Sequence, residues 1–191
     1  GLSKTKPLNV LDLGANGGGF VLNLLAKGFD LGNTLCVEMN PHTFSRLHFN
    51  VMRNVRGCKS ALNAAAWSTD ETLSVSVGHG GTGDSVNAQD GTETVQIQAR
   101  TLDSLIEEAF GDQEIDLCKI DIEGAEFEVL LGPQAGRLRQ VKRLVMEIHP
   151  HLKYQAQDLL AHVAAQGFKA TAALEKQDGG CVIYHGERCS P

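Results

Sequence analysis

Apolar and polar positions follow two different periods along the chain, and the two periods alternate. Short apolar runs, typical of buried strands, are followed by segments in which apolar residues recur every three or four positions, as in amphipathic helices. Strands are expected at residues 8–13, 34–37, 58–65, 115–122 and 143–148, and helices at residues 18–27, 41–54, 102–110, 125–131 and 154–166. This order predicts an α/β fold with a doubly wound, mostly parallel sheet that helices cover on both faces.

Two segments depart from this alternation. Between residues 72 and 99, two strand-like segments flank a glycine-rich stretch at residues 78–83, which predicts a small β insertion. Near the C-terminal end, residues 168–174 and 181–184 flank a D-G-G turn, which predicts an antiparallel hairpin. Because no linker or internal repeat interrupts the pattern, we expect residues 1–191 to form a single domain.

The segment from Asn9 to Phe20, N-V-L-D-L-G-A-N-G-G-G-F, combines a strand, a tight turn and a helix start. Its glycines allow positive φ and leave no Cβ between the backbone and a ligand. The second apolar run ends on Glu38, where a carboxylate can accept both hydroxyls of a ribose. The two features together predict a nucleoside-cofactor site, and the alternative is an ordinary tight turn between a strand and a helix.

The details of the glycine loop bear on which cofactor binds. The dinucleotide fingerprint G-x-G-x-x-G has glycine at its second position, where this chain has Asn16. Asp12, two residues before the first glycine, fits the looser D-x-G-x-N/G-x-G loop of S-adenosylmethionine enzymes. That cofactor carries an ammonium, which an acid attracts, and a carboxylate, which backbone N–H groups bind.

Composition and charge narrow the class of partner. The formal net charge is −6 and no basic run is present, which argues against a nucleic-acid backbone and does not favour an anionic membrane surface. No apolar segment has the length of a membrane span, and the first residues lack the profile of a signal peptide. The five cysteines are an odd number without metal spacing, so we expect neither disulfides nor zinc. Because the sequence shows neither a membrane span nor a signal-peptide profile, we expect a cytoplasmic location. The start at Gly1 is typical of an excised domain or a trimmed protein.

A second polar cluster lies in the segment K-I-D-I-E-G-A-E, from Lys119 to Glu126. In a strand, Lys119, Asp121 and Glu123 point to one face and the isoleucines between them to the other. A cation flanked by acids is costly to bury unless it is paired or used. In doubly wound sheets ligands bind at the carboxyl ends of the strands, where this segment, the glycine loop, Glu38 to Pro41 and Glu147 to Pro150 should converge.

Several segments, in this order and spacing, resemble the FkbM-type methyltransferase family: V-L-D-L-G-A-N-G-G, V-E-M-N-P, R-T-L-D-S-L, L-C-K-I-D-I-E-G-A-E-F-E-V-L-L-G and M-E-I-H-P. The resemblance covers most of the chain from Val10 to Pro150, and K-I-D-I-E-G-A-E is its most specific part. It implies a Rossmann-like class I methyltransferase sheet of seven strands, S-adenosylmethionine as methyl donor, and O-methylation of a hydroxyl on a sugar or other small molecule.

The resemblance also implies roles for individual residues. Asp12, Gly14, Asn16 and Gly18 would line the methionine end of the cofactor, Glu38 would hold the ribose, and Asp121 and Glu123 would lie near the transferred methyl group. One departure is Met39, where the family often places a proline directly after the acid. The absence of sequence before the first strand is a second departure, and it concerns how the substrate is capped.

The chemistry of methyl transfer needs an aligned acceptor and a base. Asp121 and Glu123 are the first candidates for base or substrate anchor, with Lys119 tuning their charge. The alternatives are that Lys119 forms a simple ion pair and that Glu123 caps the following helix. Glu147, His149 and a neutral Lys119 are further candidate bases, although His149 could equally bond a backbone carbonyl. A cation held by Asp121, Glu147 and a third acid is conceivable, but the spacing demands no metal.

The adenine side of the expected site is less defined. Asn63 to Ala65 are candidates to contact the adenine edge, and Trp67 is placed either against the adenine or in the core. His79, in the glycine-rich stretch, is a candidate substrate contact or a solvated histidine.

Two rival functions stay open at this point. One is a nicotinamide-dependent oxidoreductase, which Asn16 and the lack of an evident hydride-transfer set disfavour. The other is a cofactor-binding domain that has lost catalysis. The sequence leaves the acceptor and the oligomeric state undefined.

Overall fold

The computed structural model describes residues 2–78 and 93–189 of the chain. Its main sheet has the order β10-β11-β8-β7-β1-β2-β3, and β9 also pairs with β11. The strands are β1 (Leu8–Leu13), β2 (Leu31–Glu38), β3 (Lys59–Asn63), β7 (Leu117–Ile120), β8 (Arg143–Ile148), β9 (Phe168–Ala170), β10 (Glu175–Lys176) and β11 (Val182–Arg188). The five strands from β8 to β3 are parallel, and β11 is antiparallel to β8.

The C-terminal hairpin expected from the sequence is present, and its outer strand is divided. Both β9 and β10 pair with β11 in antiparallel register, Ala170 opposite Gly186 and Glu175 opposite Ile183. The two short strands therefore follow one another along the same edge, so the sheet has seven positions although it contains eight strands.

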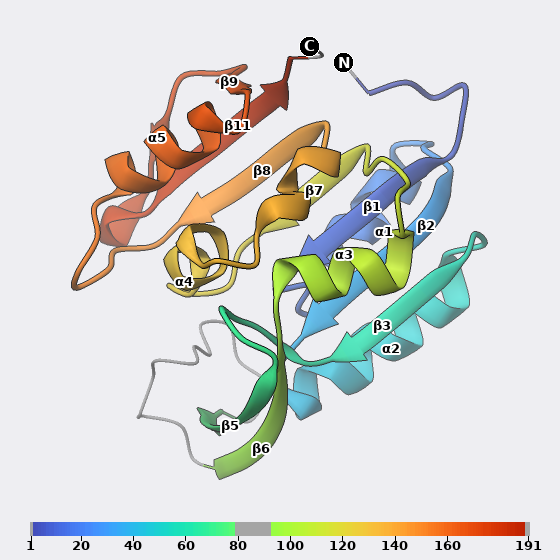
Figure 1. Ribbon diagram of the computed structural model, residues 1–191. Coiled ribbons are helices and arrows are strands. Elements are labelled where there is room, and N and C mark those ends of the chain that lie inside the picture. The colour runs from blue at the N-terminus through green and yellow to red at the C-terminus, as the bar shows by residue number, and fades with distance from the viewer. Residues whose placement is uncertain (1, 79–92, 190–191) are drawn as a thin grey trace.

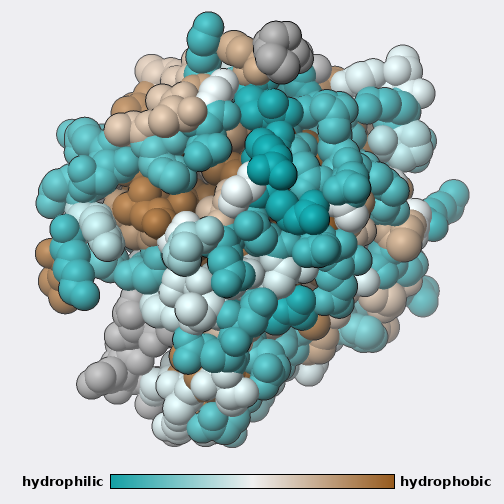
Figure 2. All heavy atoms as spheres, viewed as in Figure 1, coloured by the Kyte–Doolittle hydropathy of each residue, from teal (hydrophilic) through white to brown (hydrophobic). Residues whose placement is uncertain are grey.

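Helices cover both faces of the sheet (Figure 1). They are α1 (Gly19–Ala26), α2 (Pro41–Asn54), α3 (Leu102–Phe110), α4 (Glu126–Leu131) and α5 (Ala156–Ala165), with the short 3-10 helices η1 (Gly136–Gln140) and η2 (Asp178–Gly180). One apolar cluster joins α1 and α2 to the sheet, and a larger one joins α3, α4 and α5 to its other face. The outer surface over α3, α4 and α5 is largely hydrophilic, with apolar side chains visible between α5 and α4 (Figure 2).

Local signals explain where two of the helices begin and end. Asn40 caps α2, because its side-chain oxygen accepts hydrogen bonds from the N–H groups of His42 and Thr43. Pro41 occupies the first turn, where a missing N–H costs nothing. Gly28, at φ +80°, ends α1 as expected from the sequence.

A second, three-stranded sheet has the order β4-β6-β5, formed by β4 (Ala65–Ala66), β5 (Glu71–Val77) and β6 (Glu93–Arg100). It lies beyond the carboxyl ends of β2 and β3 (Figure 1). The single strand expected at residues 58–65 is therefore wrong: β3 ends at Asn63, and Ala65 pairs with Ala99 in the second sheet. The expected β insertion corresponds to β5 and β6, while His79 and residues 80–83 lie outside the described residues.

Two further boundaries differ from expectation. The strand expected at residues 115–122 is restricted to Leu117–Ile120, with a single bridge from Ile115 to Val141. The helix expected at residues 154–166 covers Ala156–Ala165. Among the described helices, none combines the length and the apolar character needed to cross a bilayer.

Candidate functional site

The glycine loop connects β1 to α1 at the carboxyl edge of the sheet. Gly14 has φ +74°, and a Cβ on it would lie only 1.7 Å from the carbonyl oxygen of Asp121. Glycine is therefore required at this position by the close approach of the loop after β7. Gly18, at φ +87°, is the N-cap of α1. At Gly17, by contrast, a Cβ would meet no described atom within 4 Å, so this part of the loop faces open space.

Glu38, at the end of β2, is tied to this loop. Its Oε2 accepts a hydrogen bond of 2.9 Å from the backbone N–H of Asn16, and its Oε1 accepts one of 2.8 Å from the N–H of Asn40. Asn16 itself has φ +48°, and its side-chain oxygen accepts from the N–H of Gly17. The carboxylate expected to hold a ribose is thus fixed beside the open part of the loop.

Asp12 and Lys119 form a buried pair beneath the loop. Asp12 has no solvent exposure, and its Oδ1 lies 3.5 Å from Nζ of Lys119. That distance is too long for a good hydrogen bond, and neither oxygen of Asp12 has a hydrogen-bond partner among the described residues. Burial, only partly offset by Lys119, raises the pKa of Asp12. The site therefore contains a buried carboxylate that lacks a full set of donors.

Lys119 connects Asp12 to Asp121. Its Nζ donates a hydrogen bond of 2.9 Å to the carbonyl of Gly14 and lies 3.2 Å from Oδ2 of Asp121. Although burial alone lowers the pKa of Lys119, the charges of Asp12 and Asp121 outweigh it and raise the pKa. The raised pKa favours the cationic form of Lys119 and does not support a neutral Lys119 as base. The ion pair, the alternative considered for this residue, is what the structure contains.

Glu123 lies beyond the end of β7, so the strand alternation that was predicted to place it on one face with Lys119 and Asp121 does not extend to it. Strand β7 ends at Ile120, and Glu123 and Gly124 follow with φ values of +53° and +97°. Two successive positive φ values are typical of a type I′ turn, so the backbone reverses here, while a carboxylate oxygen of Glu123 stays within 4.8 Å of one of Asp121. Glu123 also does not cap α4: its N-cap residue is Ala125, which provides no side-chain bond.

His149 follows β8 and lies between two of these acids. Its Nε2 lies 3.2 Å from Oε2 of Glu123, and its Nδ1 lies 3.0 Å from Oε1 of Glu126. Burial alone lowers the pKa of His149, but the hydrogen bonds to Glu123 and Glu126 raise it to about 11. Both ring nitrogens face carboxylates and the raised pKa favours the cation, so the geometry does not support His149 as general base.

Glu147 lies in β8, two residues before His149, with Oε1 3.9 Å from Nε2 of the ring. Burial and then the charge of Asp121 raise the pKa of the Glu147 carboxyl. Its side chain is 26% exposed, so a ligand can reach it. A carboxylate with a raised pKa is a better proton acceptor than an ordinary one.

Two groups of side chains in this cluster have ligand atoms within 4.8 Å of one another: Glu147, His149 and Cys181, and Asp121, Glu123 and His149. Both groups include His149, whose two nitrogens face carboxylates. A metal ion would have to displace Glu123 or Glu126 from the ring. The geometry therefore gives no reason to revise the expectation of a site without metal, which stays a prediction.

The residues expected near an adenine lie beside Glu38. Asn63 is the last residue of β3 and stands opposite Glu38 of β2, and Ala65 and Trp67 follow it in the chain. Asn63 donates two hydrogen bonds from its side-chain nitrogen, to the carbonyls of Glu38 and Met39. Ala65 is buried in the apolar cluster of the second sheet, so its side chain is committed to packing. Trp67 is half-buried, and its backbone N–H donates to the carbonyl of Arg100. Asn63 thus positions the end of β2.

The most important residue that the sequence analysis missed is Glu126. It has no solvent exposure, and besides the bond to His149 it accepts hydrogen bonds from the N–H groups of Ile122 and Gly124. The signal was in the sequence: E-F-E at residues 126–128 is matched by H-P-H at residues 149–151. Each glutamate pairs with the histidine 23 positions later.

The strand order, the antiparallel β11 and the glycine loop define a Rossmann-like fold of the class I methyltransferase type. Comparison with known proteins agrees. Residues 12–170 match the family described as the methyltransferase FkbM domain, and the chain belongs to this family. The resemblance noted from the sequence is confirmed, and so is the expected fold class.

Solved structures show the same fold. Methyltransferase FkbM from Methylobacillus flagellatus superposes with a TM-score of 0.58 at 17% identity, over 93% of this chain and 43% of that one. A second match is Sp1610 of Streptococcus pneumoniae, a candidate tRNA (m1A22) methyltransferase solved with S-adenosyl-L-methionine. It superposes with a TM-score of 0.54 at 14% identity, over 97% of this chain and 69% of that one.

A curated relative matches over a short segment. The AMB antimetabolite synthetase AmbE of Pseudomonas aeruginosa is 42% identical over 57 residues, which is 30% of this chain and 3% of AmbE. This chain thus spans less than half of the FkbM structure and a small fraction of AmbE. At the level of family and fold, the expected cofactor, S-adenosylmethionine, is confirmed.

Proposed function

We propose that this chain is an S-adenosylmethionine-dependent O-methyltransferase that acts on a hydroxyl of a sugar or another small molecule, and that residues 1–191 act as a single catalytic domain. The observation that carries the proposal is Asp12, a fully buried carboxylate without a hydrogen-bond donor among the described residues. A buried charge in this state is costly unless a ligand completes its environment. An ammonium group, bound directly or through water, would do so.

The residues around Asp12 fit the rest of this cofactor. Gly17 leaves open space beside the loop, where a ligand can lie against the backbone. Glu38, fixed by Asn16 and Asn40, would accept hydrogen bonds from the ribose hydroxyls. Gly14 and Gly18 shape the loop, and Asn63 to Ala65 flank the adenine end. We propose that Gly14 and Asn63 shape the cofactor site indirectly, because Gly14 packs against the carbonyl of Asp121 and Asn63 bonds the carbonyls of Glu38 and Met39.

When bound, this cofactor supplies an electrophilic methyl group on a sulfonium, and the protein has to align the acceptor and remove its proton. Asp121 and Glu123 hold the acceptor hydroxyl, since each carboxylate is fixed by a cation, at 3.2 Å in both pairs. Glu147 takes the proton as the hydroxyl oxygen forms its new bond to carbon. We therefore place Glu147 before Asp121 and Glu123 as candidate base, because its pKa is raised and its side chain is partly exposed.

The charge of the site supports a neutral acceptor. Among the ion pairs of the described residues, five carboxylates contact two cations, Lys119 and His149: these are Asp12, Asp121, Glu123, Glu126 and Glu147. A polyanion such as RNA would be repelled by this excess and by the net charge of −6. We therefore keep the prediction that nucleic acid is not a partner, although the structural neighbours include candidate RNA methyltransferases.

Methyl transfer from S-adenosylmethionine to a panel of hydroxylated sugars and small molecules, with a tRNA pool as a separate arm, tests the proposal. We expect transfer to a hydroxyl, and loss of transfer in Asp121→Ala and Glu123→Ala variants that still fold. Transfer to tRNA alone would contradict the substrate class. Cofactor binding without transfer to any acceptor would support the alternative of an inactive cofactor-binding domain.

A further inference from the structure

The turn between β7 and α4 carries an acid in an unusual backbone conformation. Glu123 has φ +53°, a region that residues with a side chain seldom adopt, and Gly124 follows at φ +97°. A non-glycine residue stays in this region only when its surroundings hold it there. The contacts that hold Glu123 are therefore of interest.

Glu126 provides the first of these contacts from inside the turn. Its Oε1 accepts hydrogen bonds of 3.1 Å from the N–H of Ile122 and 3.3 Å from that of Gly124, and its Oε2 accepts a second bond from Gly124 at 3.1 Å. The side chain is fully buried. It thus gathers the backbone N–H groups on both sides of Glu123 around one carboxylate.

His149 provides the second contact, from the end of β8. Its Nδ1 lies 3.0 Å from the same Oε1 of Glu126, and its Nε2 lies 3.2 Å from Oε2 of Glu123. The ring therefore connects the carboxylate inside the turn to the carboxylate displayed on the outside. The same arrangement occurs a second time in the site, where Lys119 connects buried Asp12 to Asp121.

We propose that Glu126 and His149 are positioning residues for methyl transfer: Glu126 fixes the turn and the imidazole ring, and the ring fixes the carboxylate of Glu123 at the acceptor side of the site. This inference rests on the proposed function for its catalytic consequence. Its geometric part, a histidine locked by a buried glutamate, stands independently of the substrate.

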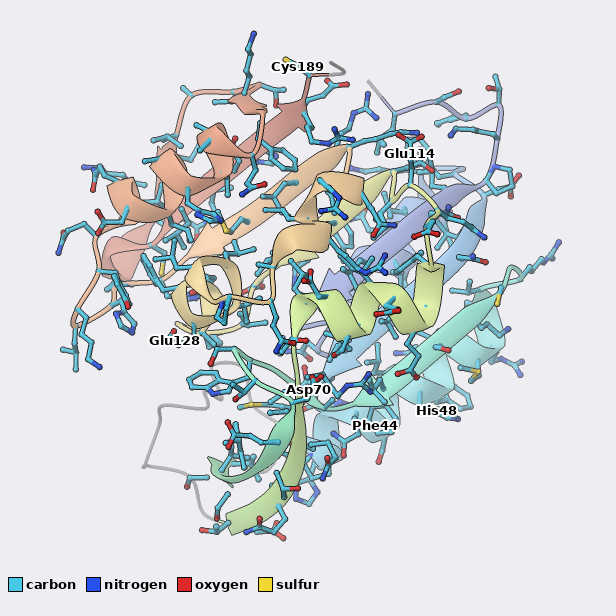
Figure 3. All side chains as sticks on the ribbon, viewed as in Figure 1. Phe44, His48, Asp70, Glu114, Glu128 and Cys189 are labelled. Atoms are coloured by element: carbon cyan, nitrogen blue, oxygen red, sulfur yellow. The ribbon has the colours of Figure 1, made fainter. Side chains whose placement is uncertain are left out.

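The chain contains its own control for this proposal. Glu128 and His151 form the neighbouring pair between the same two segments, with Oε1 and Nε2 also 3.0 Å apart. Glu128, labelled in Figure 3, lies on α4 at the carboxyl edge of the sheet. His151 packs at 5.1 Å from the ring of Phe127 and makes no contact with the turn among the interactions of the described residues. Loss of this pair should affect local packing without releasing Glu123.

The test compares Glu126→Gln and His149→Gln with Glu128→Gln and His151→Gln. Four readouts are followed: the NMR titration of the His149 ring between pH 6 and 9, hydrogen exchange at the Ile122 and Gly124 amides, the affinity for S-adenosylhomocysteine by calorimetry, and kcat with an acceptor from the panel. Other titratable groups that face the His149 ring are kept in all variants: Asp121, Glu123, Glu147 and Cys181.

In the wild-type protein we expect no titration of the His149 ring over this range. Glu126→Gln should bring the titration into the range and speed exchange at Gly124 by about tenfold or more. His149→Gln should lower kcat about 10- to 100-fold with an acceptor from the panel and change the affinity for S-adenosylhomocysteine little. Both Glu128→Gln and His151→Gln should leave His149, Gly124 exchange and kcat unchanged.

Titration of wild-type His149 near its ordinary pKa, or equal effects of the Glu126 and Glu128 substitutions on Gly124 exchange, would overturn the proposal. If Glu126→Gln does not fold, the wild-type titration and the kcat of His149→Gln still decide, and an unchanged kcat in that variant would overturn it. Failure of wild-type protein to bind S-adenosylhomocysteine would instead contradict the proposed function, and the two failures are therefore distinguishable.

Discussion

His149 and Glu126 lie 3.0 Å apart, Nδ1 to Oε1, although the glutamate has no contact with solvent. Residues that lie 23 positions apart in the sequence thus form one of the innermost polar contacts of the site. Together with the hydrogen bond to Glu123, this contact raises the pKa of His149 and favours its cationic form. It also has a consequence for stability.

The free energy of unfolding should fall as the pH rises above about 6.5, because His149 then loses its proton in the unfolded chain but keeps it in the folded protein. The folded-state pKa of about 11 lies above the unfolded value, so the stabilisation is complete below pH 6.5 and is lost on the way to pH 11. The expected slope from this group is at most about 1.4 kcal/mol per pH unit. Urea unfolding at pH 7, 8 and 9 measures it, and an equal slope in His149→Gln would contradict the assignment.

Asp12→Asn should weaken binding of S-adenosylhomocysteine by about tenfold or more, the equivalent of about 1.4 kcal/mol. It should not lower the free energy of unfolding of the cofactor-free protein at pH 7, since the raised pKa means that the ionised Asp12 is unfavourable in the folded state.

A control for Asp12 is Asp116, which is also buried but lies at the opposite end of the strands, near Lys6 and the N–H of Asn9. Burial alone raises the pKa of Asp116, but these hydrogen bonds outweigh it and the pKa is lowered. Asp116→Asn should therefore cost about 1–3 kcal/mol of stability and leave cofactor affinity unchanged. If Asp12→Asn instead lowered the free energy of unfolding and left cofactor affinity unchanged, while Asp116→Asn weakened cofactor binding, Asp12 would stabilise the fold and would not bind the cofactor.

Two glycines of the same loop should respond differently to alanine. Gly14→Ala places a methyl group 1.7 Å from the Asp121 carbonyl at φ +74°, so we expect a loss of at least about 3 kcal/mol in stability. Gly17→Ala meets no described atom and should change the free energy of unfolding by less than about 1 kcal/mol while it weakens S-adenosylhomocysteine binding. Thermal unfolding and calorimetry together check this, and unchanged affinity in Gly17→Ala would place the cofactor elsewhere.

Glu147→Gln should lower kcat by about 10²- to 10⁴-fold with a hydroxyl acceptor and leave S-adenosylhomocysteine affinity near that of the wild type. The acidic limb of the kcat/KM profile should lie above the ordinary value of 4.5 for glutamate, because burial and Asp121 raise the pKa of Glu147. Asp121→Asn and Glu123→Gln are the comparison variants, and we expect them to raise KM for the acceptor. A Glu147→Gln enzyme with full kcat would return the role of base to Asp121 or Glu123.

Much of the fold could be predicted from local signals. The range of α2 follows from the cap at Asn40 and from Pro41, and the end of α1 from Gly28, because each signal acts within one turn of chain. The break after Asn63 was not predictable in this way. Ala65 leaves the main sheet because it pairs with Ala99, which is distant in the sequence.

In the site, too, features set by local sequence could be predicted, and features set by tertiary contacts could not. The sequence brought Asp12, the glycine loop and Glu38 together correctly, because strand ends converge at one edge of a parallel sheet. The strand conformation predicted for Glu123 was wrong, since β7 ends at Ile120 and a turn of two positive φ values follows. The raised pKa of His149 depends on Glu123 and Glu126, which become its neighbours only when the end of β8 packs beside the turn before α4.

The most direct measurement for the whole account is calorimetric titration of the wild-type protein with S-adenosylhomocysteine and, separately, with NADH. The account predicts binding of one S-adenosylhomocysteine per chain, weakened in Asp12→Asn and Gly17→Ala, and no binding of NADH. Binding of NADH alone, or S-adenosylhomocysteine affinity that is unchanged in both variants, would contradict it.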